Sequence, residues 1–149
     1  QLSSIIEFIN DNNDEFNYFK NIGWNIKNIE SQLSKDNNYS LGYYEANNLA
    51  GVLIGDAIKN DKDYELELHI LFVSKDLRRK QIATKLLNYV EGNNINFSKI
   101  FIEVAEDNVK AISFYQKNNF VFLNFRHNYY KYNDKNIHAK CFIKNINYE

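Results

Sequence analysis

Apolar side chains recur every three or four positions over the first 40 residues, which is typical of amphipathic helices. The positions that share this spacing are Ile5, Ile6, Ile9, Ile22, Ile26, Ile29 and Leu33. Gly23 and Trp24 interrupt the pattern. We therefore predict helices on both sides of Gly23-Trp24.

The spacing changes to that of strands from Tyr39 onward. Segments 39–45 and 49–58 are aromatic and β-branched, and the polar break at Ala46-Asn47-Asn48 between them indicates a hairpin. Segment 64–73 alternates as a third strand. We expect one of its faces to hold Leu66, Leu68, Ile70 and Phe72, and the other to hold Glu65, Glu67, His69, Leu71 and Val73.

A helix and a further strand follow this third strand. Ile82, Leu86, Leu87 and Val90 have helical spacing, and 100–104 is a short apolar run. Such a βαβ unit implies parallel strands joined by a right-handed crossover, with ligands bound at the carboxyl ends of the strands, here near Val73 and Val104. Asp107-Asn108 is expected to cap a helix through Ala111 and Tyr115, and segments 120–125 and 139–146 are the last predicted strands.

Composition narrows the function classes. The 149 residues are expected to form one domain, 1–149. The net charge of −1, from 18 basic and 19 acidic residues, argues against a direct nucleic-acid partner. Cys141 is the only cysteine, no Cys/His spacing suggests a metal, and His69, His127 and His138 are interpreted as structural or surface residues. No apolar run approaches the roughly 20 residues of a membrane span, and the start does not resemble a signal peptide, so a cytoplasmic protein without a membrane partner is expected.

Three features are candidates for chemistry. Two of the three arginines lie in the basic turn Arg78-Arg79-Lys80-Gln81-Ile82-Ala83, where a helix N-terminus and cations could hold a phosphate, although a solvated charge run is the alternative. Glu103 shares a strand face with Phe101 and suits a general base, unless it reaches solvent or pairs with a lysine. Tyr115 is either a core aromatic residue or a proton donor.

Taken together, these segments resemble a known family. Glu65 to Phe120 resembles the acetyl-CoA-binding core of the GNAT superfamily of N-acetyltransferases, through Leu71-Phe72-Val73, Arg78 to Ala83, Asn108 to Tyr115 and Asn119-Phe120. The resemblance implies an α/β fold in which a mixed, mostly antiparallel central sheet contains the parallel βαβ unit and carries helices on both faces. It also implies acetyl-CoA as cosubstrate.

A narrower resemblance extends from Trp24 to the C-terminus. Trp24-Asn25, Phe101 to Val104 with Asn108, and Arg126-His127-Asn128-Tyr129-Tyr130 are similar to segments of the bacterial ribosomal-protein-alanine N-acetyltransferase branch. That branch acetylates the N-terminal α-amine of a protein. The implied partner is an acceptor protein N-terminus, with a small-subunit ribosomal protein as the example.

The resemblance implies a role for each matching residue. Glu103 would remove the proton of the amine, Tyr115 would protonate the departing thiolate, and backbone amides at a bulge near 71–73 would polarise the thioester. The implied acetyl-CoA contacts are Leu71, Phe72, Val73, Arg78, Arg79, Lys80, Gln81, Ile82, Ala83, Thr84, Asn108 and Tyr115, with the pyrophosphate on the amides from Arg79 to Thr84. The implied acceptor contacts are Trp24, Glu67, Arg126, Tyr129 and Tyr130.

Two departures from the family pattern keep rival functions open. Gln81 replaces the first loop glycine, and Asn119 replaces the closing glycine, a position that asparagine tolerates in the left-handed conformation. One rival is a small-amine acetyltransferase for a polyamine or an antibiotic, whose cation would be attracted by Glu65, Glu67, Glu7, Asp11, Asp14 and Glu15. The other is a non-catalytic acyl-CoA-binding module, which Gln81 suggests. Tyr129-Tyr130 argues against the first, and Glu103 with Tyr115 argues against the second.

Overall fold

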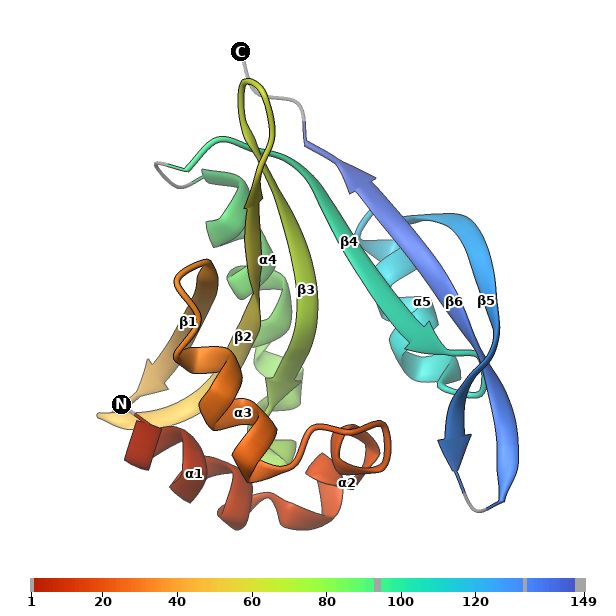
Figure 1. The fold of residues 1–149 in the computed structure, drawn as a ribbon. Coiled ribbons are helices and arrows are strands. Elements are labelled where there is room, and N and C mark those ends of the chain that lie inside the picture. The colour runs from red at the N-terminus through yellow and green to blue at the C-terminus, as the bar shows by residue number, and fades with distance from the viewer. Residues whose placement is uncertain (1, 93–94, 133, 147–149) are drawn as a thin grey trace.

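The computed structural model describes residues 2–92, 95–132 and 134–146, with the side chains of Arg79, Lys80 and Tyr132 excepted. Its centre is a six-stranded sheet in the order β1-β2-β3-β4-β6-β5 (Figure 1). All neighbours are antiparallel except β3 and β4. The strands are β1 (Asn38–Glu45), β2 (Asn48–Lys59), β3 (Tyr64–Val73), β4 (Phe97–Ala105), β5 (Val121–Tyr132) and β6 (Lys135–Asn145). The predicted mixed, mostly antiparallel sheet is confirmed.

Helices cover both faces of this sheet, as predicted (Figure 1). On one face, α1 (Leu2–Asp11), α2 (Asn13–Asn21) and α3 (Ile26–Leu33) enclose an apolar cluster with β2 and β3. On the other face, α4 (Ile82–Gly92) and α5 (Val109–Lys117) enclose a second cluster. The short 3-10 helix η1 (Lys75–Lys80) leads from β3 into α4. None of the described helices is long and apolar enough to cross a membrane.

The expected alternation of β3 is wrong beyond its middle. Ile70 pairs with Ile54 and Leu68 pairs with Gly55, so His69 is an extra residue, a β-bulge. Leu66 and Leu68 pack against α4, whereas Ile70 and Phe72 pack against the N-terminal helices. A bulge places one residue more on one strand than on its partner, and the faces of all later residues are therefore exchanged.

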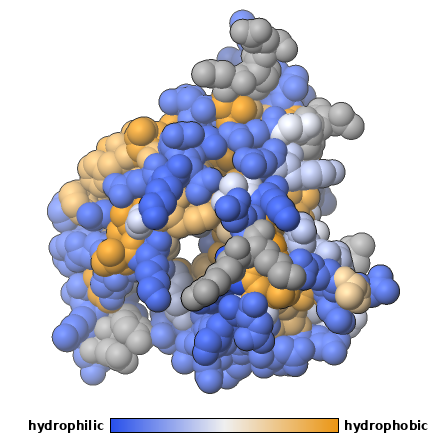
Figure 2. Space-filling view, turned by 180° about the vertical axis from the view of Figure 1, so that it is seen from behind, coloured by the Kyte–Doolittle hydropathy of each residue, from blue (hydrophilic) through white to orange (hydrophobic). Residues whose placement is uncertain are grey.

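The bulge lies where β3 and β4 separate. The two parallel strands pair only from Tyr64–Phe97 to Leu68–Ile102, and their carboxyl ends then diverge (Figure 1). Seen from behind, the surface is hollowed at the corresponding place near its centre (Figure 2). From His69 onward, none of the described strands pairs with the edge of β3 that faces β4.

Candidate active site

The junction between β3 and α4 forms one end of the candidate site. The amides of Ile82, Ala83 and Thr84 belong to the first turn of α4, where backbone N–H groups have no intrahelical acceptor and the helix dipole is positive. A Cβ added at Gly51 would lie 2.9 Å from Ile82 Cγ2, so this turn sits directly on β2. The junction can therefore hold an anion through backbone groups on a rigid base.

The Arg78 side chain contacts the end of β3. Arg78 Nε donates to the carbonyl oxygen of Val73 at 3.3 Å, and its guanidinium lies 5.9 Å from the Phe72 ring centroid, so Arg78 ties the loop to the end of β3. The side chains of Arg79 and Lys80, also predicted to contact acetyl-CoA, lie outside the described part of the structure.

Gln81 adopts the backbone conformation that a glycine would have at its position. Its φ of +58° and ψ of +32° are left-handed, and its side chain is exposed. Asn119, the other departure, has a φ of +71°. Both residues thus have the positive φ that glycine adopts freely, Gln81 at a steric cost of about 1–2 kcal/mol.

The strand end itself contributes backbone rather than side chains. The Phe72 ring is buried and makes edge contacts with Phe8, Phe16 and Phe19, with centroids 5.1 to 6.0 Å apart. Val73 is buried against α4. The expectation of a bulge near 71–73 is wrong, because the bulge is at His69 and residues 71–73 pair regularly with β2. In an antiparallel pair only alternate residues bond to the same neighbour, so some amides of this stretch face the open edge.

A cavity of about 1080 Å³ lies on the sheet face beside α3, across the gap between β3 and β4. Residues from the α2–α3 loop, α3, β3, β4, β5 and β6 line it. All the predicted acceptor residues are brought together there, along with the predicted base: Trp24, Glu67, Glu103, Arg126, Tyr129 and Tyr130. The sequence separates these residues by up to 106 positions, so the fold alone assembles them.

Glu103 is not an isolated carboxylate among apolar neighbours. Arg126 Nη1 on β5 donates to Glu103 Oε1 on β4, and the Arg126 guanidinium lies 4.0 Å from the ring centroid of Tyr129. The hydrogen bond to Glu103 and the negative charge of that group raise the pKa of Arg126 above its ordinary value. Glu103 thus faces the cavity as one half of an ion pair, with arginine where the sequence suggested a lysine.

Tyr115 does not line this cavity. It is buried on the α4–α5 side of the sheet between the rings of Phe114 and Phe120, at centroid distances of 5.3 and 5.2 Å. Burial raises the pKa of its phenol well above the ordinary value, and the nearby Tyr18 phenol raises it further. The Tyr115 hydroxyl is therefore protonated at neutral pH.

Tyr18 is a candidate that the sequence did not single out. Its hydroxyl accepts a hydrogen bond from the amide of Ala105, the last residue of β4, at 3.1 Å, and it also bonds to the Asn108 side chain. Burial raises its pKa above the ordinary value. Asn108 caps α5 as predicted, accepting from the Ala111 amide at 3.3 Å. Tyr18, Asn108 and Tyr130 line a second hollow of about 340 Å³.

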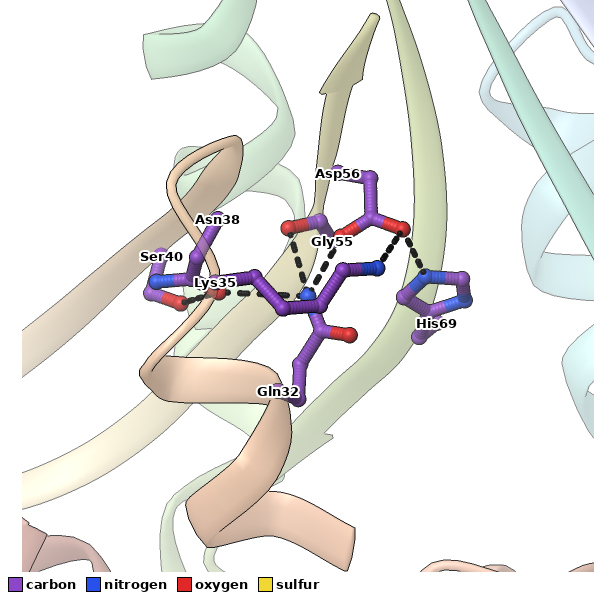
Figure 3. A network of polar contacts seen from close by, with 7 residues as sticks. All are labelled: Gln32, Lys35, Asn38, Ser40, Gly55, Asp56 and His69. Carbon is purple, nitrogen blue, oxygen red and sulfur yellow. Dashed lines mark hydrogen bonds and ion pairs between the residues drawn. The ribbon is translucent and has the colours of Figure 1, made fainter.

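A polar network that the sequence did not predict borders the large cavity (Figure 3). The buried Asp56 carboxylate on β2 accepts from Gln32 Nε2 at 2.6 Å and Lys35 Nζ at 2.8 Å, and His69 Nε2 lies 3.1 Å away. Burial alone would raise the pKa of Asp56, but these three partners outweigh it and lower the pKa to about 2. Ligand atoms of Asp56, Glu67 and His69 lie within 4.8 Å of one another, as in some metal sites. Because the Lys35 ammonium already neutralises the Asp56 carboxylate, we assign no metal to these three residues.

Comparison with known proteins adds the family context. The acetyltransferase (GNAT) family matches residues 5–120. The chain is similar to the crystal structure of the ribosomal-protein-S18-alanine N-acetyltransferase from Escherichia coli (21% identity, TM-score 0.71, covering 85% of this chain and 79% of that one). It is also similar to Arabidopsis thaliana NAA60 in complex with a bisubstrate analogue (18%, 0.75, 97% and 94%). A third similar structure is an aminoglycoside 6'-N-acetyltransferase complexed with coenzyme A (17%, 0.64, 83% and 81%). No curated protein matches the sequence.

Proposed function

The chain belongs to the GNAT acetyltransferase family, and on that premise we propose that it transfers an acetyl group from acetyl-CoA to the N-terminal α-amine of a protein. A protein with an N-terminal alanine, such as a ribosomal protein, is the proposed acceptor, and such a substrate would place the enzyme in the cytoplasm. The similarity to the alanine N-acetyltransferase from Escherichia coli supports this choice.

Acetyl-CoA binding rests on the diverging strands and on the first turn of α4. The pyrophosphate would bind the amides from Arg79 to Thr84, where the helix dipole favours an anion. The pantetheine arm would lie in the gap between β3 and β4 and bond to the open edge at Leu71 to Val73. An amide of that edge would also polarise the thioester carbonyl, as donors of an oxyanion hole do.

The reaction is a direct attack of the amine nitrogen on the thioester carbon. Glu103 would bind the ammonium group and remove its proton. The N–C bond then forms, the C–S bond breaks, and Tyr115 would give its proton to the thiolate. The nitrogen releases its second proton to solvent, which leaves a neutral amide, and solvent returns a proton to Tyr115. An α-amine has an unperturbed pKa of about 7.7–8.0, so it loses its proton far more readily than a lysine side chain does.

The large cavity is the observation that carries the choice of acceptor. The cavity of about 1080 Å³, lined by Trp24, Tyr129 and Tyr130, has room for several residues of an extended chain, and Glu103 also lines it. Aromatic walls contribute large contact areas at low entropic cost. A peptide N-terminus would enter along these walls with its amine toward the gap between the strands.

Mass spectrometry of peptides incubated with the chain and acetyl-CoA tests this proposal. A peptide beginning with alanine should be acetylated once, at its first residue. The same peptide with a blocked N-terminus and an internal lysine should not react.

A small amine is the second candidate, because Glu65, Glu67 and Glu103 all line the cavity and would attract a polycation. Similarity to the aminoglycoside acetyltransferase is compatible with it. Turnover of a polyamine or an aminoglycoside above that of every N-terminal peptide would favour this candidate and overturn the protein acceptor.

A further inference from the structure

His69 stands where the two parallel strands part. The last β3–β4 pair is Leu68 with Ile102, and the next residues along the two strands are His69 and Glu103. Both side chains line the large cavity. Regular alternation places His69 on the same face as Glu65 and Glu67, which also line the cavity, and the bulge exchanges the faces only of the residues that follow His69.

The imidazole of His69 is held on two sides. Its Nε2 lies 3.1 Å from Asp56 Oδ2, and its ring packs against Trp24 with centroids 5.2 Å apart. Asp56 is in turn fixed by Gln32 and Lys35 (Figure 3). Because the pKa of Asp56 is lowered to about 2, the carboxylate is ionised at neutral pH and accepts a hydrogen bond. The proton of a neutral His69 therefore sits on Nε2, which leaves the lone pair on Nδ1.

Nδ1 lies on the side of the ring away from Asp56 (Figure 3). Within the residues that the structure describes, no hydrogen bond reaches this nitrogen. The charged groups around the ring are Asp56 on β2, Lys35 in the turn after α3, and Glu65 and Glu67 on β3, with Glu103 on β4 and Arg126 on β5. A carboxylate of Glu67 lies within 4.8 Å of the His69 and Asp56 ligand atoms. Carboxylates thus outnumber cations around the ring.

We propose that His69, oriented by Asp56, is a second proton acceptor for the attacking amine, opposite Glu103. This inference rests on the proposed acetyl transfer. The N–H bond of the ammonium breaks, directly or through one water, and an Nδ1–H bond forms. The amine lone pair is freed to attack the thioester, and the imidazolium later releases the proton to solvent. Glu103 Oε1 already accepts a hydrogen bond from Arg126. A second proton acceptor on β3 would therefore assist Glu103 on β4.

A double-mutant cycle tests the proposal, using His69→Gln, Glu103→Gln and the combination. Saturating acetyl-CoA and an alanine-initiated peptide are used, and kcat is followed as thiol release from pH 6 to 9. The double variant should lose roughly 10²–10⁴-fold in kcat, the contribution of a positioned base, and each single variant should lose less. In Glu103→Gln, the remaining kcat should depend on pH, because only a neutral imidazole accepts a proton, and adding His69→Gln should remove that dependence. His127→Gln, an exposed histidine of β5, is the matched control.

The proposal is overturned if His69→Gln leaves kcat and its pH profile unchanged in both backgrounds. A purely structural ring would alter thermal stability or KM without touching the pH profile. Failure of the proposed function looks different, because a preference for another amine would appear with the unmodified chain. The same cycle is then run on that amine.

Nitrogen NMR of histidine-labelled protein gives a second test that needs no turnover. The proposal requires His69 at pH above 8 to carry its proton on Nε2 and a lone pair on Nδ1. Observation of the Nδ1–H tautomer would overturn it, whatever the acceptor. Asp56→Asn should shift the tautomer toward Nδ1–H, because an asparagine oriented by Gln32 can donate to Nε2.

Discussion

The two halves of the candidate site are built in different ways. The β3–η1–α4 half uses backbone, namely the open edge of a strand and the first turn of a helix, and its side chains mainly pack inward. The half beside α3 uses side chains from six separate elements, joined by contacts such as Arg126–Glu103 and Lys35–Asp56. The first half can therefore bind the same cosubstrate with varied side chains, whereas each substitution in the second half changes what is bound or how protons move.

The largest predicted effect is on kcat, and it comes from a change at Tyr115, which lines neither the large cavity nor the first turn of α4. Tyr115→Phe removes the phenolic proton but keeps the ring between Phe114 and Phe120. If Tyr115 protonates the thiolate, kcat should fall roughly 10²–10⁴-fold, with acetyl-CoA binding nearly unchanged. Steady-state kinetics and a thermal shift with CoA measure the two quantities. Tyr39→Phe, which alters another buried tyrosine of the same apolar cluster, is the control. Equal turnover by Tyr115→Phe and the parent chain would return Tyr115 to a packing role.

Glu103→Gln tests the side-chain half alone. The amide preserves shape but not charge, and it leaves the Arg126 guanidinium without its anion. We expect kcat/KM to drop roughly 10-fold or more at pH 7 and to recover in part as pH rises, because free amine then forms without help. Binding of acetyl-CoA should not change, since the backbone half holds it. A loss of acetyl-CoA affinity would contradict this separation of the two halves.

The Asp56 network gives the side-chain half a stability that depends on pH. The carboxyl pKa is lowered from 3.8 to about 2 in the folded protein, so ionised Asp56 favours folding. This contribution, roughly 2 kcal/mol, is full above about pH 4 and is lost as pH falls toward 2. Chemical unfolding at several pH values should show the loss in the parent chain but not in Asp56→Asn. Asp36→Asn, which removes an exposed carboxylate, should behave like the parent chain.

These differences explain what the sequence could and could not predict. Periodicity and turn residues predicted each strand, and Asn108 was predicted as a cap, because these features depend on neighbours in sequence. The faces of Ile70 and Phe72 were predicted wrongly, because one extra residue at His69 leaves no mark in the alternation. The Asp56–His69 contact, which joins β2 and β3 at that bulge, was not predicted either. In the sequence, Asp56 is only a single polar residue within an apolar segment. The Tyr18 hydroxyl accepts a hydrogen bond from the amide of Ala105, which is 87 positions away in the sequence. Only the packing of α2 against the end of β4 brings the two together.

The smallest predicted effect concerns the backbone half. Gln81 has a left-handed φ of +58°, which is costly for a residue with a Cβ, whereas glycine adopts it freely. Gln81→Gly relieves this strain, but glycine also gives the unfolded chain more conformational freedom, which cancels part of the gain. The net free energy of unfolding should rise by about 0.5–1 kcal/mol, and Tm should rise by roughly 2–4 °C. Asn119→Gly is the matched control, because asparagine tolerates its φ of +71° and the gain should be near zero. Acetyl-CoA affinity of Gln81→Gly should stay the same or rise, since the amides of α4 make the contacts. Strongly weakened binding would show that the glutamine side chain itself touches the cosubstrate, and the contrast between a backbone half and a side-chain half would then fail at this residue.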